Sequence, residues 1–127
     1  MKVGVLTGGG DCPGLNAVLR AIVRKAERFY GDEIIGFRDG WRGVIENDYE
    51  VLDIDRLRGT LPRGGTILGT SRITPYMVDG GIDKIRATRE DLGLDALIVI
   101  GGEGTLSCGL QVWRDGVVPV VGVPKTI

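Results

Sequence analysis

The sequence predicts an α/β fold, in which a mostly parallel sheet carries helices on both faces. Short apolar runs end in glycine-rich turns and lead into helical patterns, first at Lys2–Thr7 and again at Ala96–Ile100. The 22 glycines cluster in such turns and follow no collagen period. Parallel sheets bind ligands at the carboxyl ends of their strands, so we expect a site in the loops after Thr7, Ile100 and Val123.

The N-terminal elements have the clearest pattern. Lys2–Thr7 (KVGVLT) is an apolar run typical of a buried parallel strand. A helix is predicted from near Asn16, because apolar residues recur there at spacings of three and four. Gly31-Asp32 should end this helix, and Glu33–Phe37 (EIIGF) is predicted as the second strand. The apolar face of the helix comprises Leu15, Val18, Leu19, Ile22, Val23 and Ala26.

The middle of the chain gives weaker signals. Residues 38–70 hold short apolar pieces (VLDI and TILGT) between Gly, Asp and Pro, which predict only brief strands and a turn of helix. Ile82–Leu92 is predicted as a helix, with Asp79 or Asp83 near its start.

The last part of the chain returns to the alternating pattern. Ala96–Ile100 (ALIVI) is predicted as a central strand, followed by a helix from about Leu106 to Arg114. Val117–Val123 is the last predicted strand, and Pro119 should lie near its beginning because proline lacks the N–H that a sheet requires.

Composition limits the kind of protein. A length of 127 residues predicts one domain, and 16 Lys plus Arg against 17 Asp plus Glu do not favour a nucleic-acid or membrane partner. The apolar runs are too short for a signal peptide or a membrane span. Cys12 and Cys108 form no CxxC pair and the chain has no His, so we expect no zinc site but two reduced thiols in a cytoplasmic protein.

The first glycine-rich loop, GGGDCPGLN from Gly8 to Asn16, is a candidate phosphate site. Glycines let the backbone approach a phosphate, and the N-terminus of the following helix offers free N–H groups. The alternative is a plain tight turn between strand and helix. The loop is neither GxGxxG nor GxxxxGK[ST], which disfavours dinucleotide-binding and P-loop proteins.

The second loop, Gly101-Gly102-Glu103-Gly104-Thr105, is a candidate site for a metal and phosphates. Glu103 is a lone carboxylate among glycines at a strand end and could hold magnesium, while Gly104 leaves room for phosphates and Thr105 offers a hydroxyl. The alternative is that Glu103 is a solvated turn residue.

Four motifs together resemble the phosphofructokinase family. They are TGGGDCPGLN, RGGTILGTSR, IGGEGT and VPKTI, in the family's order and approximate spacing between Val3 and Ile127. GGEGT alone is weak, since NAD kinases and lipid kinases carry a similar GGDGT, but GGGDCPGLN does not belong to those enzymes. The resemblance implies that residues 1–127 form an N-terminal, Rossmann-like nucleotide-binding domain that is incomplete, with the sugar-phosphate-binding half absent.

The resemblance also implies an activity. It is that of an ATP-dependent 6-phosphofructokinase, an allosteric glycolytic enzyme of the cytoplasm. Such an enzyme transfers the γ-phosphoryl group of MgATP to the 1-hydroxyl of fructose 6-phosphate, and the full-length protein is expected to be a homotetramer.

The family pattern assigns roles to individual positions. Gly10 would pack against the nucleotide phosphates, and Trp41 takes the place of an aromatic beside the adenine, although it could equally be a core residue. Arg72 matches the arginine that spans the donor and acceptor phosphates. Glu103 replaces the more usual Asp as magnesium ligand, and Thr126 matches the threonine beside the reacting hydroxyl of the sugar. Gly102, Gly104 and Thr105 complete the nucleotide-binding set.

Two positions bear on the phosphoryl donor and two on an effector. Gly104 favours ATP, because pyrophosphate users resemble GGDD, whose second Asp would collide with the inner phosphate of a nucleotide. Lys125 is instead the residue found in pyrophosphate users. Steric exclusion is the more decisive effect, so ATP is the predicted donor. Arg20 and Arg24, which form one stripe with Arg28, match positions that bind a phosphorylated effector, although a solvated face is the alternative.

The general base of the reaction is not expected within these residues. The family continues after PKTI with Asp-Asn-Asp, whose first Asp takes the proton of the sugar hydroxyl. We therefore expect the 127 residues alone to be inactive, and their sheet to leave an exposed apolar edge. The alternatives are a pyrophosphate-dependent phosphofructokinase and a non-catalytic nucleotide- or effector-binding fragment.

Overall fold

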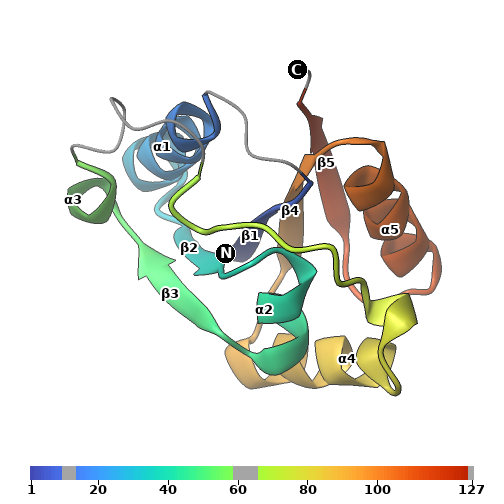
Figure 1. Cartoon of the computed structure of the whole chain (residues 1–127). Coiled ribbons are helices and arrows are strands. Elements are labelled where there is room, and N and C mark those ends of the chain that lie inside the picture. Colours follow the sequence, from blue (N-terminus) through green and yellow to red (C-terminus); the bar gives the residue numbers. More distant parts are fainter. Residues whose placement is uncertain (10–13, 59–65, 126–127) are drawn as a thin grey trace.

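The computed structural model describes residues 1–9, 14–58 and 66–125, and within them five strands form one sheet in the order β3-β2-β1-β4-β5 (Figure 1). Four strands are parallel: β1 (Lys2–Thr7), β2 (Glu33–Phe37), β4 (Ala96–Gly101) and β5 (Val120–Pro124). Only β3 (Tyr49–Leu52) runs antiparallel, against β2, among the strands of the described ranges. The predicted fold class, a mostly parallel sheet, is confirmed.

Helices cover both faces of the sheet, because successive side chains of a strand point to opposite sides. The core beneath α1 (Leu15–Lys25), its π-helical extension η1 (Ala26–Tyr30) and α3 (Ile54–Leu57) takes in Val3, Val5 and Ile34. The core on the other side takes in Leu6, Ile35 and Phe37. It is covered by α2 (Trp41–Glu46), α4 (Gly81–Leu92) and α5 (Glu103–Arg114), with the short 3-10 helix η2 (Pro75–Met77) before α4.

Several predicted boundaries are confirmed. The two first strands have the predicted bounds, and Gly31 ends the first helix in the left-handed conformation, with φ 64°. The helix α4 runs from Gly81 to Leu92, close to the predicted bounds, and Asp83 lies in its first turn as expected.

Three predictions were wrong in detail. Residues 38–58 form the six-residue helix α2 besides β3 and α3, which is more than the predicted turn of helix. The apolar piece TILGT contributes no strand in the described residues 66–70. The last strand begins at Val120, since Val117 and Val118 are instead buried in the core at 2% and 3% exposure. Pro119 therefore precedes the strand.

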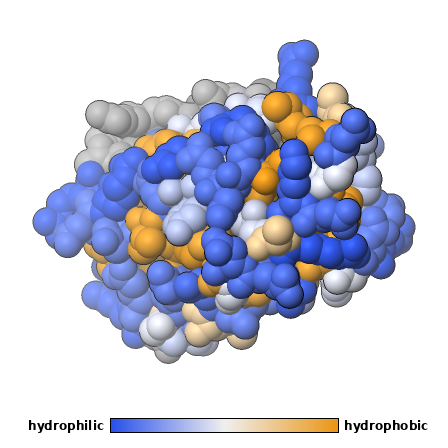
Figure 2. All heavy atoms as spheres, turned by 90° about the horizontal axis from the view of Figure 1, so that it is seen from below, coloured by the Kyte–Doolittle hydropathy of each residue, from blue (hydrophilic) through white to orange (hydrophobic). Residues whose placement is uncertain are grey.

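The surface is mixed, and one sheet edge is open in the described part of the chain. Among these residues β5 pairs only with β4, and Val121 on β5 is 57% exposed. The face seen in Figure 2 is mainly hydrophilic, with apolar residues in scattered patches. Within the described ranges, every helix is too short or too polar to cross a membrane.

Candidate functional site

Three chain segments meet at the carboxyl edge of the parallel strands. Thr7 at the end of β1 is in register with Ile100 of β4, and the amide of Gly8 donates to the carbonyl of Ile100 at 2.9 Å. The amide of Lys125, directly after β5, donates to the carbonyl of Gly101 at 3.1 Å. The loops that follow β1, β4 and β5 therefore converge as expected.

Glycines at this edge make room for Thr105. A Cβ added at Gly8 would lie 2.5 Å from Oγ1 of Thr105, and one added at Gly101 would lie 2.7 Å from Cβ of Thr105. Both distances are shorter than real contacts, so no other residue fits without a shift of the backbone or of Thr105. Thr105 thus locks the start of α5 against the end of β1.

Two helix N-termini point to the same edge. The helices α1 and α5 begin after Gly14 and Gly102, and no side chain caps either helix. The first N–H groups of a helix have no partner within it and attract anions. Residues 103–105 were predicted as a loop before a helix from about Leu106, but they form the first turn of α5. The amide of Leu106 bonds to the carbonyl of Gly102 at 3.0 Å, and an acidic residue at Glu103 suits the helix dipole.

A pocket of about 250 Å³ lies between these segments and the irregular stretch before η2. The predicted residues Trp41, Arg72, Gly104 and Thr105 line it together with Gly9. A Cβ added at Gly102 or Gly104 would meet nothing within 4 Å, so the start of α5 is open. The structure therefore brings together residues that are far apart in the sequence, from Gly9 to Thr105.

Trp41 fits both roles that the sequence left open. Its side chain is 3% exposed and belongs to the core beneath α2, α4 and α5, yet it also lines the pocket. Its Nε1 is buried without a hydrogen-bond partner in the described part of the chain. A buried indole N–H without a partner is costly, so a ligand acceptor at this position would be favourable.

Two cations at the site lack anionic partners. Arg72 is exposed and makes no hydrogen bond or ion pair within the described residues. The amine of Lys125 is buried, and it too lacks a partner among them. It lies 3.5 Å from where a Cβ of Gly9 would be, which places the charge over the first glycine loop. Since a buried charge without a counter-ion is unfavourable, this site suits an anion.

The donor set around Glu103 fits a magnesium ion that arrives with phosphates. Glu103 is exposed at the start of α5, and no group of three or more metal-ligating side chains occurs in residues 1–9, 14–58 and 66–125. Magnesium is commonly held by one or two carboxylates plus phosphate oxygens and water. Glu103 could therefore anchor an ion that a phosphoryl donor completes, whereas the described residues alone form no metal cage.

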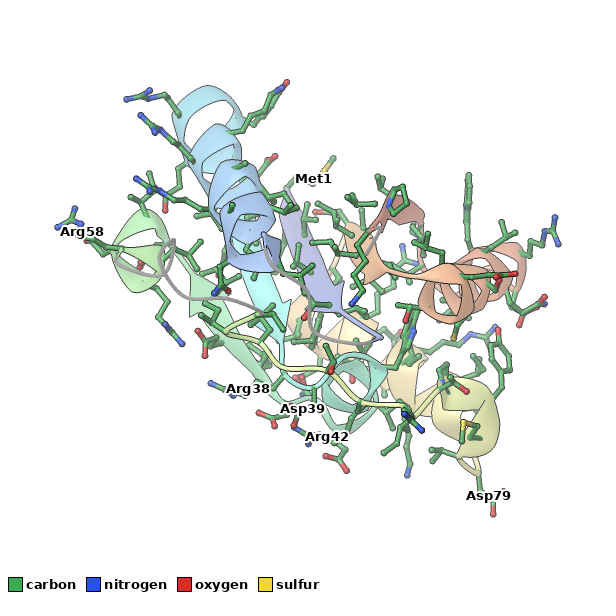
Figure 3. All side chains as sticks on the ribbon, turned by 45° about the horizontal axis from the view of Figure 1, so that its top comes forward. Met1, Arg38, Asp39, Arg42, Arg58 and Asp79 are labelled. Carbon is green, nitrogen blue, oxygen red and sulfur yellow. The ribbon has the colours of Figure 1, made fainter. Side chains whose placement is uncertain are left out.

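The turn between β2 and α2 is held by a network of paired charges (Figure 3). Arg42 bonds to Asp39 and Asp48 at 2.8 Å each, and also to Glu46. Arg38 bonds to Asp48 at 2.6 Å and to Glu50 at 3.1 Å. The hydrogen bonds from Arg42 and Arg38 lower the pKa of Asp48, and they raise the pKa values of both arginines. This network fixes Asp39 next to Trp41.

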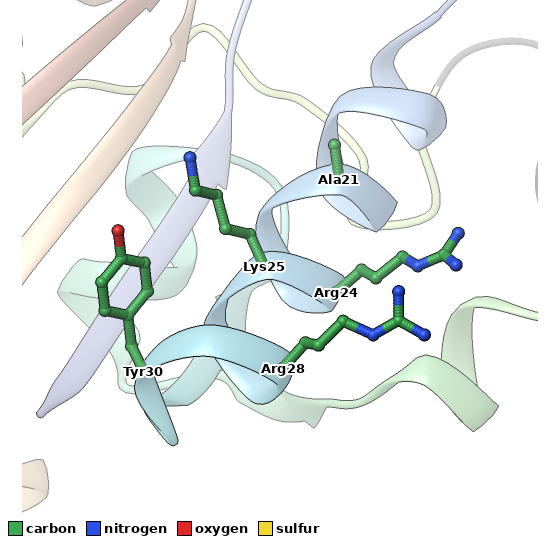
Figure 4. Close-up of a pocket in the computed structure, with 5 residues that line it drawn as sticks. All are labelled: Ala21, Arg24, Lys25, Arg28 and Tyr30. Atoms are coloured by element: carbon green, nitrogen blue, oxygen red, sulfur yellow. The ribbon is translucent and has the colours of Figure 1, made fainter.

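The predicted effector residues lie on a separate surface (Figure 4). An open depression of about 690 Å³ on α1 and η1 is lined by Ala21, Arg24, Lys25, Arg28 and Tyr30, none of which lines the strand-end pocket. Arg24 and Arg28 extend in the same direction, and Arg20 on this helix is half-buried. The depression is larger than the strand-end pocket, but it lacks glycine loops and helix N-termini.

Sequence reasoning missed some residues of the site and named two that lie outside the described residues. Gly10 and Thr126 are the two. The missed residues are Ser71, Ile73 and Thr74, which line the pocket with Gly9 of the predicted phosphate loop. Thr7 was also missed, although a polar residue that ends a run of buried apolar residues is a signal that can be read from sequence.

Comparison with known proteins shows which family has this fold and these motifs. The family model described as phosphofructokinase matches residues 2–127. The chain belongs to the phosphofructokinase family. Its fold superposes on phosphofructokinase from Saccharomyces cerevisiae with a TM-score of 0.90 and 26% identity, over 98% of this chain and 20% of that one. For the T-state structure of Pichia pastoris phosphofructokinase the values are 0.89 and 28%, over 98% and 15%.

The curated relatives carry two kinds of name. The chain is 57% identical to ATP-dependent 6-phosphofructokinase 3 of Streptomyces coelicolor. It is 59% identical to a pyrophosphate–fructose 6-phosphate 1-phosphotransferase of Amycolatopsis methanolica. Each match covers 100% of this chain and 37% of the relative, so the chain spans little more than a third of their length.

Proposed function

We propose that this chain binds the phosphoryl donor of a 6-phosphofructokinase reaction, with MgATP as donor and fructose 6-phosphate as acceptor in a protein of its relatives' length. The observation that carries the proposal is the pocket at the carboxyl edge of the sheet. Two uncapped helix N-termini face that edge, and Arg72 and the buried amine of Lys125 lie there without anionic partners among the described residues. Each of these features favours a phosphate.

Each site residue would have a different role in phosphoryl transfer. Glu103 would hold magnesium, which when bound neutralises charge on the donor phosphates. Gly102, Gly104 and Thr105 would receive the phosphates at the start of α5, and Gly10 would do so in the first loop. Arg72 would stabilise the transferring group, and Thr126 would orient the sugar hydroxyl.

The transfer requires a general base for the proton of the sugar hydroxyl. The oxygen of the sugar 1-hydroxyl forms the new bond to the γ-phosphorus, the bond from that phosphorus to the bridging oxygen of ADP breaks, and the base takes the hydroxyl proton. The described residues would contribute the donor side of this reaction.

Open space at Gly104 supports ATP as the donor. A side chain at this position would project where nothing lies within 4 Å, in the pocket that Trp41 also lines. A nucleotide needs this room for its inner phosphate, whereas pyrophosphate does not. The second candidate donor, pyrophosphate, is favoured by the buried amine of Lys125, which a small, highly charged anion would neutralise.

Calorimetric titration of the chain with MgATP and with magnesium pyrophosphate tests the proposal. We expect MgATP to bind, Glu103→Ala to weaken it, and Gly104→Asp to weaken MgATP far more than magnesium pyrophosphate. Circular dichroism confirms that each variant is folded. A folded chain that binds neither donor contradicts the proposed function, and preferential binding of pyrophosphate contradicts the choice of ATP.

Activity is tested in a chimaera. Residues 1–127 replace the matching segment of ATP-dependent 6-phosphofructokinase 3 of Streptomyces coelicolor, and the rate of fructose 6-phosphate phosphorylation is measured with each donor. We expect turnover with ATP from a cytoplasmic, homotetrameric protein. Arg20→Ala and Arg24→Ala should alter only the response to phosphorylated effectors.

A further inference from the structure

The stretch that carries Arg72 has no regular secondary structure, yet hydrogen bonds fix it to three other elements. Between residues 66 and 74 the described chain forms bends and coil, and it reaches Arg72 without a helix or strand. Oδ1 of Asn16 on α1 accepts from the amide of Ile67 at 2.7 Å. The amide of Asp39, after β2, donates to the carbonyl of Leu68 at 2.8 Å. A third set of contacts comes from Thr7 on β1.

Thr7 is completely buried, and its hydroxyl makes two contacts with this stretch. Oγ1 of Thr7 donates to the carbonyl of Gly69 at 2.8 Å and lies 2.9 Å from Oγ1 of Thr66. A hydroxyl has one proton, so Thr66 must be the donor in the second contact. Oγ1 of Thr66 in turn accepts from the amide of Leu68 at 3.1 Å. The result is a directed chain of hydrogen bonds from Leu68 through Thr66 and Thr7 to Gly69.

The Asp39-Gly40 turn closes the other side of the stretch. The hydroxyl of Ser71 donates to the carbonyl of Asp39 at 2.6 Å. Asp39 and Gly40 both have positive φ, 56° and 65°, and a Cβ at Gly40 would lie 3.1 Å from the carbonyl oxygen of Thr7. The end of β1, this turn and Ser71 are therefore packed together immediately before Arg72.

We propose that Thr7 is a positioning residue, whose hydroxyl holds residues 66–72 against the sheet and thereby places Arg72 at the phosphate pocket. The inference rests on the proposed function, which gives Arg72 its role. A hydroxyl is required at this position because valine, the residue of equal shape, removes the donor to the carbonyl of Gly69 and the acceptor for the hydroxyl proton of Thr66. Thr7 touches no substrate in this account and acts through Arg72.

Thr88 provides a matched control. It is 3% exposed, and its hydroxyl donates to the carbonyl of Val44 at 2.7 Å, from α4 to α2. Thr88→Val therefore removes the same kind of buried hydroxyl–carbonyl bond as Thr7→Val, but away from the pocket. An effect that is seen only in Thr7→Val and is confined to residues 66–72 would therefore report on the position of Thr7, beyond the general loss of a hydroxyl–carbonyl bond.

The first test needs no ligand. Amide hydrogen exchange is measured by NMR for Leu68 and Asp39, whose amide hydrogen bonds tie the stretch in place. Thr7→Val should accelerate exchange at both amides by about tenfold more than the loss of global stability accounts for. This factor corresponds to the loss of about one hydrogen bond. Thr88→Val should not, and Thr7→Ser should restore protection. Unchanged relative protection in Thr7→Val would overturn the proposal, whether or not the chain binds a donor.

The second test is a double-mutant cycle on MgATP affinity, measured by calorimetry. Thr7→Val should weaken binding by about fivefold to tenfold in the wild-type background and have no further effect in the Arg72→Ala background. Equal losses in both backgrounds would show that Thr7 does not act through Arg72. If the folded wild-type chain binds neither MgATP nor magnesium pyrophosphate, the proposed function fails, and hydrogen exchange still decides whether Thr7 holds the stretch.

Discussion

Two groups of cations lie near the carboxyl ends of β1, β2 and β5, and they differ in their partners. Arg38 and Arg42, at the end of β2 and the start of α2, each contact two or more carboxylates. Arg72 and Lys125, beside the glycine loops, contact none in the described residues. Arg38 directly follows β2 and Lys125 directly follows β5, so a place at a strand end does not explain the difference.

Arg38 and Arg42 therefore stabilise the fold through their ion pairs, whereas the charges of Arg72 and Lys125 are available to a ligand. A cation whose carboxylates are already in place has little to gain from an external anion, whereas a cation without a counter-ion, above all the buried amine of Lys125, remains available to pair with one. Pairing thus distinguishes the two groups, although they have the same chemistry. Substitutions in the paired group should therefore change stability, whereas substitutions in the unpaired group should change donor binding and catalysis.

The largest expected effect is on catalysis. In the chimaera with the Streptomyces coelicolor enzyme, Arg72→Ala should lower kcat by about 10²-fold to 10³-fold, because it removes a charge that stabilises the transition state. Thermal stability should stay unchanged, since Arg72 has no partner among the described residues to lose. Steady-state kinetics and thermal unfolding check both parts, and a variant with normal kcat but a lowered Tm would reverse the assignment.

The next effect is on donor affinity. Lys125→Met keeps the aliphatic stem but removes the charge, and it should weaken binding of magnesium pyrophosphate by about tenfold or more, on the scale of one charge-assisted hydrogen bond. MgATP should be weakened less. Because the buried amine has no partner among the described residues, the same variant should unfold at the same or a higher temperature. Equal affinity of wild type and variant for both donors would exclude Lys125 from the site.

A smaller effect, on stability, is expected in the paired group. Arg42→Ala leaves Asp39, Glu46 and Asp48 without this partner and should lower the free energy of unfolding by about 1 kcal/mol, since partly exposed ion pairs contribute little each. Urea denaturation measures the change, and donor affinity serves as the control. If Arg42→Ala weakened donor binding more than Arg72→Ala does, the distinction between paired and unpaired cations would fail.

The smallest effect is a pH dependence. Hydrogen bonds from Arg42 and Arg38 hold the pKa of Asp48 below its ordinary value. A lowered folded-state pKa stabilises the protein above the unfolded-state pKa, and that stability is lost as the pH falls through the folded-state value. The stability of the wild type should therefore fall below about pH 4, and that of Asp48→Asn should fall less steeply over the same range. Parallel slopes for the two proteins would contradict the pairing seen at Asp48.

The same contrast shows what the sequence could and could not predict. The strands β1, β2 and β4 and the helices α1 and α4 follow from apolar periodicity and from glycines that end elements. The start of α5 does not, because Gly102, Glu103 and Gly104 look like a loop until the contact between Thr105 and Gly8 is known. Such a contact depends on which strands are neighbours in the sheet.

The candidate site divides in a similar way. Arg72, Glu103 and Gly104 stand in motifs, so the sequence alone singles them out, and the structure places Arg72 and Gly104 in one pocket. Thr7 and Ser71 also stand in family motifs, but they form hydrogen bonds to residues 62 and 32 positions away, which no local pattern reveals. The pairing of Arg42 and the lack of pairing at Lys125 are likewise properties of the folded chain.

The most direct test of the account is to record amide chemical shifts of the ¹⁵N-labelled chain while MgATP is added. We expect the chemical shifts of the amides of Gly9, Arg72, Gly104 and Thr105 to change together with one dissociation constant. The shifts of Arg38, Arg42 and Arg24 should not change. Shifts confined to α1 around Arg24 and Arg28, with the strand-end glycines unmoved, would contradict it and place the nucleotide on the other basic surface.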